Sequence, residues 1–108
     1  MWTPPHVFEA AKTSLDALLG RMGYAVLPVA LAPEAFGSAH AEYRSSNRAV
    51  RLVWDGKESA LWAEVDQDGH WLDVEALVSG GSLALCKEQG PERAAALVES
   101  VRALLAAE

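Results

Sequence analysis

Apolar residues recur at two spacings along this chain, and the spacing separates predicted helices from predicted strands. Between residues 7 and 21 they recur every three or four positions, which places them on one stripe of a helix. Pro4 and Pro5 precede this segment, and Gly20 and Gly23 bracket its end, where a left-handed cap needs no Cβ. The stripe consists of Phe8, Ala11, Leu15, Leu18, Leu19 and Met22.

A second helix is predicted after Gly90-Pro91, because proline is favoured in the first turn of a helix. Its apolar stripe consists of Ala94, Leu97, Val98, Val101, Leu104 and Leu105. Between the two helices the period falls to two, which is typical of strands with one buried face. The alternation predicts strands over residues 40–45, 49–55, 59–66 and 70–75.

Residues 24–32 form a further short apolar run, but Pro28 interrupts it. Proline cannot donate a hydrogen bond to a neighbouring strand, so this run is predicted to be an edge strand or a bulged one. Residues 76–90 contain the flexible sequence Ser79-Gly80-Gly81-Ser82. Leu83 to Cys86 is either a short fifth strand of the sheet or part of a loop.

Two Asp-Gly pairs predict tight hairpins, because both central residues of a type I′ turn need positive φ. A two-residue turn at Asp55-Gly56 pairs Leu52 with Ser59 and Val50 with Leu61. A two-residue turn at Asp68-Gly69 pairs Val65 with Leu72 and Ala63 with Val74. Both registers collect the apolar residues on one face, and a slip of one residue would move them all to the other.

These elements predict one α+β domain over residues 1–108: an N-terminal helix, a four-stranded antiparallel meander and a C-terminal helix. An antiparallel sheet can keep one face in water, so we expect both helices to pack on the other. The residues expected beneath the helices are Val50, Leu52, Leu61, Ala63, Val65, Leu72 and Val74.

Negative charge is concentrated in one segment of the chain. Residues 55–75 carry seven acids and a single base, Lys57, so this segment accounts for a net charge of −6, equal to that of the whole chain. The segment covers the predicted last hairpin and contains two of the four tryptophans, Trp62 and Trp71.

By alternation, the helix-free face of this hairpin presents Trp62, Glu64, Asp66, Trp71, Asp73 and Glu75, with Arg51 and Val53 on the neighbouring strand. Clustered carboxylates steer a basic partner, and tryptophan is enriched among residues that dominate binding energy. We therefore predict a partner-binding face for a protein, most simply a basic one. Two other interpretations stay open: a homodimer contact and a solvated sheet face.

No catalytic or metal-binding motif is found in the sequence. Asp66-Gln-Asp68-Gly69 resembles the start of a calcium loop, but lacks a third acid before the glycine, and a hairpin turn explains it. The three histidines have no zinc spacing, and Cys86 is the only cysteine. We therefore predict no enzyme activity, no catalytic residue, no metal and no cofactor.

Composition indicates the cellular compartment, the class of partner and the kind of genome. A single cysteine allows no intrachain disulfide, and no signal peptide or membrane span is predicted, so we expect a cytoplasmic protein. The net charge disfavours nucleic acid as a partner. Twenty alanines, three lysines and no isoleucine are typical of a GC-rich bacterial genome.

The order of elements resembles a group of small bacterial proteins with helix–meander–helix architecture. The resemblance lies in a leading helix that ends at Gly23-Tyr24, a Tyr43-Arg-Ser45 strand, the run Val50-Arg-Leu-Val-Trp-Asp-Gly-Lys-Glu58, a tryptophan-bearing strand and a terminal helix. This group includes immunity proteins that neutralise polymorphic toxins. The resemblance implies an acidic inhibitor or adaptor that blocks a toxin enzyme, and it transfers no functional residue.

Three hypotheses follow from the sequence. The first is a non-enzymatic protein-binding module that uses the acidic face with Trp62 and Trp71. The second is a homodimeric structural protein joined through sheet faces or edge strands. The third is a small-ligand-binding domain, since tryptophan beside carboxylates can hold a polar ring, and this hypothesis requires a concave site.

Overall fold

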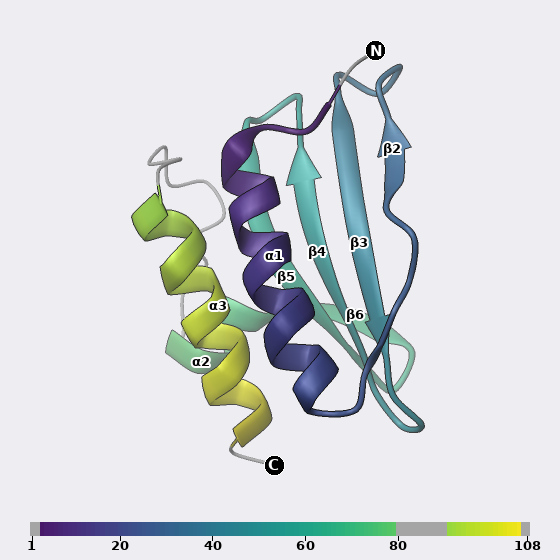
Figure 1. Ribbon diagram of the computed structural model, residues 1–108, viewed down its shortest axis with the longest axis vertical. Helices are drawn as coiled ribbons and strands as arrows, with labels where there is room; N and C mark the ends of the chain where they lie inside the picture. Colours follow the sequence, from purple (N-terminus) through teal and green to yellow (C-terminus); the bar gives the residue numbers. More distant parts are fainter. Residues whose placement is uncertain (1–2, 80–90, 107–108) are drawn as a thin grey trace.

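The computed structural model describes residues 3–79 and 91–106, which form three helices and one antiparallel sheet (Figure 1). The helices are α1 (His6–Arg21), α2 (Val74–Ser79) and α3 (Pro91–Ala106). The strands are β1 (Ala25–Val26), β2 (Ala30–Ala32), β3 (Ser38–Arg44), β4 (Ala49–Asp55), β5 (Ala60–Gln67) and β6 (His70–Asp73). The predicted α+β architecture is confirmed, but the sheet has six strands rather than four.

The first helix ends as its glycines predict. The N–H of Tyr24 donates to the carbonyl of Leu19 at 2.9 Å, and the N–H of Gly23 donates to Gly20 at 3.2 Å. Gly23 has a φ of 90°, which a side chain would resist. This Schellman arrangement satisfies the last carbonyls of α1 and turns the chain toward the sheet.

The predicted edge strand is present and is split where Pro28 lies. Both β1 and β2 pair with β3, through Val26 opposite Tyr43 and Leu31 opposite Ala39. The rest of the sheet is the predicted meander, in the order β3, β4, β5, β6. Leu83 to Cys86, the candidate fifth strand, lies outside the described residues.

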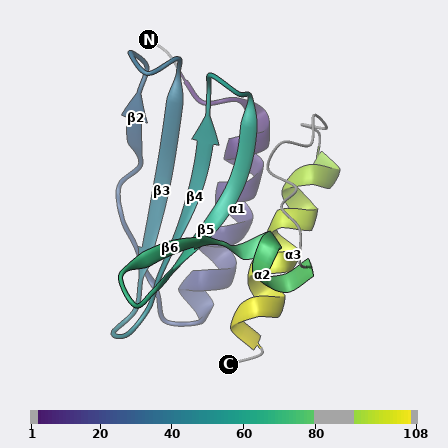
Figure 2. The same cartoon turned by 180° about the vertical axis from the view of Figure 1, so that it is seen from behind.

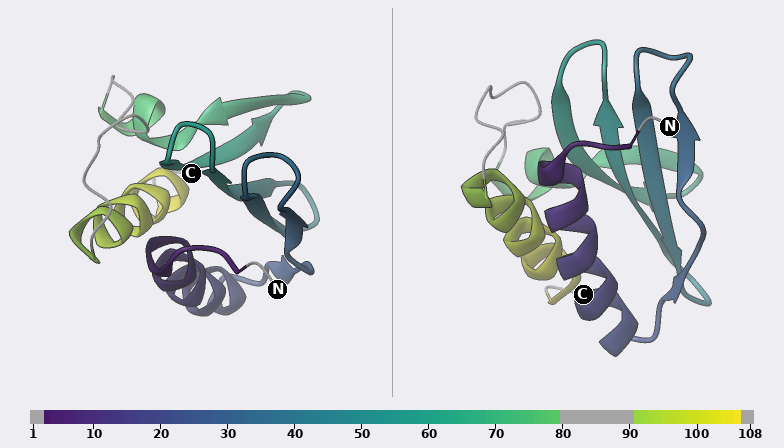
Figure 3. Two further views of the ribbon diagram at one scale, coloured as in Figure 1. Left: turned by 90° about the horizontal axis from the view of Figure 1, so that it is seen from above. Right: turned by 45° about the horizontal axis from the view of Figure 1, so that its top comes forward.

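Helices α1 and α3 lie side by side against one face of the sheet, and α2 lies beside α3 at the end of β6 (Figures 1 and 3). The core between the layers contains Phe8, Leu15 and Leu19 of α1 and Leu97 and Val101 of α3, all fully buried. Alternate residues of the central strands supply the sheet side of the core: Ala39, Ala41, Tyr43, Val50, Leu52, Trp54, Leu61, Ala63 and Val65. Figure 2 shows the opposite face, called the helix-free face because α1 and α3 do not cover it; β6 runs there at a steep angle to β3 and leads into α2 at the margin.

The register of the second hairpin agrees with the prediction, whereas that of the first does not. Asp68 and Gly69 have φ of 54° and 84°, as a type I′ turn requires, and Val65 faces Leu72. In the first hairpin the loop has four residues, 56–59, and Leu52 faces Ala63. The predicted pairs Leu52 with Ser59 and Val50 with Leu61 are therefore wrong.

The last strand ends two residues earlier than predicted. The Asp73 carboxylate accepts a hydrogen bond from the N–H of Ala76 at 3.1 Å, as the N-cap of a helix does. The chain therefore enters α2 at Val74 instead of continuing the strand, and the predicted pair of Ala63 with Val74 does not form. Val74 is still fully buried, while Leu72 is only half-buried.

Candidate functional site

The helix-free face of the sheet carries a row of charged residues that runs straight across four strands. Glu42 of β3 faces Arg51 of β4, Arg51 faces Glu64 of β5, and Glu64 faces Asp73 of β6. One arginine therefore lies among three carboxylates in a single cross-strand row. Opposite charges on directly facing positions stabilise a sheet, so Arg51 favours the pairing of β4 with β3 and with β5, whereas Glu64 and Asp73 face each other as like charges.

Arg51 and Glu64 connect the two tryptophans of this face. The Arg51 Nε and Nη2 both donate to Glu64 Oε1, the former at 2.9 Å, and the guanidinium carbon lies 4.2 Å from the centre of the Trp71 ring. On the other side, Trp62 Nε1 donates to Glu64 Oε2 at 3.0 Å. We call this chain of contacts, Trp62–Glu64–Arg51–Trp71, the tryptophan ladder.

The tryptophan ladder is partly shielded from water. The side chains of Arg51 and Glu64 are 27% and 18% exposed, and both indoles are half-buried. Partial burial strengthens the ion pair relative to a fully solvated one, and two donors on the single oxygen Glu64 Oε1 restrict the orientation of the guanidinium. Both indole rings are thus held in place on the sheet face opposite α1 and α3.

Seven of the eight predicted site residues lie on this face or at its margin and are half-buried. They are Arg51, Val53, Trp62, Glu64, Asp66, Trp71 and Asp73. Two of the carboxylates also have local structural roles. Asp66 accepts the N–H of Gly69 at 3.0 Å within the hairpin turn, and Asp73 caps α2.

The eighth residue, Glu75, was placed wrongly by the alternation. It is 1% exposed and forms a two-pronged ion pair with Arg93 of α3, whose Nη1 donates to Oε2 at 2.8 Å and Nη2 to Oε1 at 2.6 Å. Arg93 Nη2 also donates to the carbonyl of Leu61 at 2.7 Å. The start of α2 rotates Glu75 away from the helix-free face and into the interior.

A signal for this turn exists in the sequence. Asp73 precedes Val-Glu-Ala-Leu, three of which are good helix formers, and an acid stands in the first turn at Glu75. That pattern is typical of a helix N-terminus. Arg93 could not be identified as the partner of Glu75, because only the tertiary fold brings α2 and α3 together.

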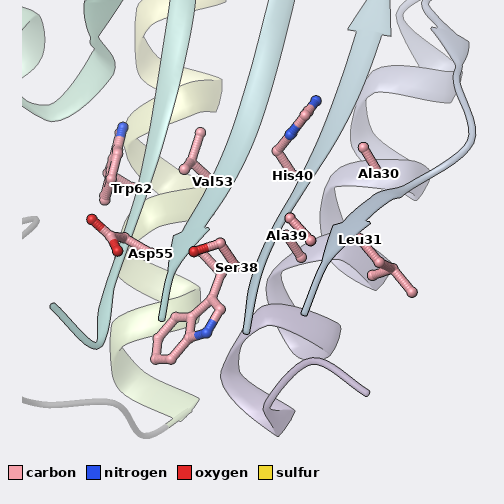
Figure 4. Close-up of a pocket in the computed structure, with 10 residues that line it drawn as sticks. Ala30, Leu31, Ser38, Ala39, His40, Val53, Asp55 and Trp62 are labelled. Atoms are coloured by element: carbon pink, nitrogen blue, oxygen red, sulfur yellow. The ribbon is translucent and has the colours of Figure 1, made fainter. Parts of the chain in front are cut away.

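A hollow of about 290 Å³ lies on the same face, beside Trp62 and toward the split edge strand (Figure 4). In the sheet register Trp62 faces Val53, Val53 faces His40, and His40 faces Ala30, so four strands contribute one row of its lining. Figure 4 shows Asp55 and Ser38 beside this row, below Trp62 and Val53 in the view. Strand β2 lines the hollow with Leu31 and with two small residues, Ala30 and Ala32.

The polar groups of the hollow are partly used by the adjacent turns. Asp55 Oδ1 accepts the N–H of Lys57 at 3.0 Å and that of Glu58 at 3.4 Å. Ser38 Oγ donates to the carbonyl of Ala35 at 2.8 Å and accepts the N–H of Gly56 at 3.1 Å. The sequence placed His40 and Val53 on strand faces but could not reveal the hollow, which depends on the pairing of β2 with β3.

Within residues 3–79 and 91–106, no group of three or more histidine, cysteine, aspartate or glutamate side chains is arranged to hold a metal ion. No helix among these residues has the length and apolar character needed to cross a membrane. Comparison of the chain with protein-family models, curated proteins and solved structures gives no match. The function must therefore be argued from the site itself.

Proposed function

We propose that this chain is a non-enzymatic protein-binding module, an immunity-like inhibitor or adaptor, that binds its partner through the helix-free sheet face. The observation that carries the proposal is the tryptophan ladder. It holds two half-buried indoles in fixed orientations on the sheet face opposite α1 and α3.

Two physical arguments support protein binding at this face. A tryptophan whose orientation is already fixed loses little conformational entropy on binding and removes a large apolar area from water. The flanking carboxylates Glu42, Asp55, Asp66 and Asp73 outnumber the bases Arg44 and Arg51 on the same face, so the surface favours a basic partner.

The proposal is tested with a Trp62→Ala, Trp71→Ala double variant. A partner captured from lysate of the source organism is purified, and its affinity for wild type and variant is measured by calorimetry. We expect a loss of at least about 2 kcal/mol of binding free energy, as for residues that dominate an interface. Met22→Ala serves as a control, because Met22 is 44% exposed and lies at the end of α1, off this face.

Equal affinity of the wild type and the double variant would place the binding surface elsewhere. Circular dichroism of each variant confirms that it remains folded. If the captured protein is a second copy of this chain, sedimentation equilibrium reports a dimer, and the homodimer becomes the function to pursue.

A second candidate is small-ligand binding, because the hollow beside Trp62 supplies the concave site that this function requires. An indole face next to a carboxylate suits a polar ring such as a sugar. A panel of neutral sugars, followed by tryptophan fluorescence, tests this candidate. A saturable change that is absent in Trp62→Ala would favour it over protein binding.

A further inference from the structure

The tryptophan ladder shows how this face binds a guanidinium group. Arg51 lies over the ring of Trp71, 4.2 Å from its centre, and donates two hydrogen bonds to one carboxylate, Glu64. An aromatic face attracts a cation through its quadrupole, and a carboxylate matches the planar donors of a guanidinium. An indole and a carboxylate side by side therefore form a complete guanidinium site.

The hollow brings together the same two groups. Trp62 and Asp55 both line it, and the described residues that line it include no lysine or arginine. Asp55 Oδ1 accepts hydrogen bonds from two backbone N–H groups of the turn. Asp55 Oδ2 has no hydrogen-bond or ion-pair partner among the described residues. The nearest base in sequence, Lys57, lies with its ammonium 5.7 Å from the centre of the Phe36 ring instead.

The remaining lining suits the stem of a long cationic side chain. Val53 and Ala30 provide apolar surface across the floor, and His40 adds a second ring in the same row. Arginine and lysine bury their methylene stems along apolar surface while the charged end reaches a polar group. A hollow of about 290 Å³ is close to the smallest size of known ligand pockets, which suits one side chain rather than a large cofactor.

We propose that this hollow is an anchor site for one arginine side chain of the protein partner, with the guanidinium between Trp62 and Asp55. This inference rests on the proposed function and deepens it, because it states the chemistry of the partner: an exposed arginine on a basic surface. The occupant is a side chain of that protein. Binding of a free neutral sugar in the hollow, in place of an arginine side chain, would overturn the inference.

The site is tested directly with a model compound. N-acetyl-arginine amide is titrated into ¹⁵N-labelled protein, and N-acetyl-citrulline amide, its neutral analogue of the same shape, is the matched ligand control. We expect chemical-shift changes around Val53, Asp55 and the Trp62 indole N–H, with a dissociation constant on the order of 1 mM. The citrulline compound is expected to bind at least about tenfold more weakly, because its N–H donors carry no positive charge to strengthen the hydrogen bonds to a carboxylate.

Two variants remove the site in different ways. Asp55→Asn keeps an oxygen for the turn N–H groups but removes the charge, and about tenfold weaker binding of the arginine compound is expected. Ala30→Phe leaves every charge in place and fills the hollow, so binding should be lost. Glu58→Gln is the matched control: it removes a neighbouring carboxylate that does not line the hollow and should change affinity by less than about twofold.

Equal binding of the arginine and citrulline compounds, unchanged binding in Asp55→Asn, or no localised shifts at tens of millimolar compound would each overturn the inference. The proposed function is tested separately with Trp71→Ala, since Trp71 does not line the hollow. If Trp71→Ala no longer binds the partner but Asp55→Asn still does, the proposed binding face is supported and the arginine site is not. In the reverse case, the arginine compound binds the hollow but the partner binds equally well without Trp62 and Trp71. That result retains the arginine site and removes the proposed function.

Discussion

At the scale of single residues, Gly56 shows how a correct residue can be predicted for the wrong reason. The sequence suggested that Gly56 provides positive φ in a two-residue turn, but it is not among the residues with positive φ. The absence of a side chain at Gly56 leaves room for the backbone carbonyl of Phe36. A Cβ at this position would lie 1.9 Å from the carbonyl oxygen of Phe36 and 2.7 Å from its carbonyl carbon. The two turns beside the hollow therefore contact each other backbone to backbone.

Gly56→Ala is expected to lower the free energy of unfolding by about 2 kcal/mol or more, because the clashing atoms belong to the backbone and cannot rotate away. Urea unfolding measures this loss. Gly20→Ala is the matched control: nothing lies within 4 Å of its added methyl group, and it sits in the last turn of α1. There we expect a gain of up to about 1 kcal/mol. Equal effects of both changes would contradict this account of Gly56.

Tyr43 provides a second prediction at this scale. Its hydroxyl donates to Asp16 Oδ1 at 2.8 Å from a fully buried position. Burial, and then the hydrogen bond and negative charge of Asp16, raise the pKa of Tyr43 well above its ordinary value of 10.0. The folded state therefore holds this proton more tightly than the unfolded chain does.

We expect Tyr43→Phe to cost about 1 kcal/mol near neutral pH through the lost hydrogen bond. In the wild type, the contribution of Tyr43 is fully present below the pKa of the unfolded chain, about 10, and declines as pH rises above it. The stability difference between wild type and variant should therefore shrink in alkali. Urea unfolding of both proteins on either side of pH 10.0 measures it, and a constant difference would be inconsistent with the raised pKa.

At the scale of elements, the two hairpins show what alternation can and cannot determine. The predicted partner of Leu52 was Ser59 and the observed one is Ala63, four residues further along. An even displacement keeps every apolar side chain on the same face, so the burial pattern gives no sign of it. Only the loop conformation, four residues with Ser59 at φ 51°, fixes the register. The second hairpin was predicted correctly because its turn is a true two-residue one.

The Glu75–Arg93 pair joins α2 to α3 and supplies the prediction at this scale. Both side chains are nearly inaccessible, 1% and 4% exposed. Removing one member leaves a buried charge without its counter-ion, so Glu75→Leu alone is expected to cost about 3–5 kcal/mol. The double change Glu75→Leu, Arg93→Met should recover most of that loss, since apolar side chains of similar length fill the space without a charge.

Urea unfolding of the two single variants and the double variant forms a complete cycle. Arg102→Gln is the control, because its partner Glu99 lies on the surface and both side chains are more than half exposed. That change should alter stability by less than about 0.5 kcal/mol. A double variant as unstable as the worse single variant would mean that the pair acts through packing rather than charge.

At the scale of the whole molecule, the fold redistributes the charge that the sequence concentrates. Among the acids of residues 55–75, Glu64 pairs with Arg51 and Glu75 with Arg93, and both arginines come from outside that segment. Counting these two arginines reduces the local net charge from −6 to −4. The helix-free face is therefore acidic but less so than the sequence alone implies.

This leads to a prediction for the kinetics of partner binding. The association rate should fall by about tenfold as salt rises from low to physiological ionic strength, while the dissociation rate changes little. Stopped-flow fluorescence measures both. Asp68→Asn, at an exposed turn position that asparagine also tolerates, should slow association, and Glu9→Gln on the helix side should not. Equal effects of the two changes would exclude steering by this face.

The sequence was most informative where local pattern and burial coincide. Both long helices and the edge strand at Pro28 were placed correctly, and seven of the eight candidate residues lie on the predicted sheet face, because each placement depends on periodicity or on a single proline. The burial of Glu75 and the hollow depend on contacts between elements distant in the chain: α2 with α3, and β2 with β3. Alternation within one strand carries no information about such contacts.

The interruption of the edge strand at Pro28 has a consequence for the protein at high concentration. The edge formed by β1 and β2 offers segments of only two and three residues, and the other edge, β6, is four residues long before α2 begins. A long, straight edge would template the strand of a neighbouring molecule and start a fibril. Within residues 3–79 and 91–106, neither edge provides a continuous row of backbone donors and acceptors long enough for that. The proline that shortens the sheet thus protects the chain from polymerisation.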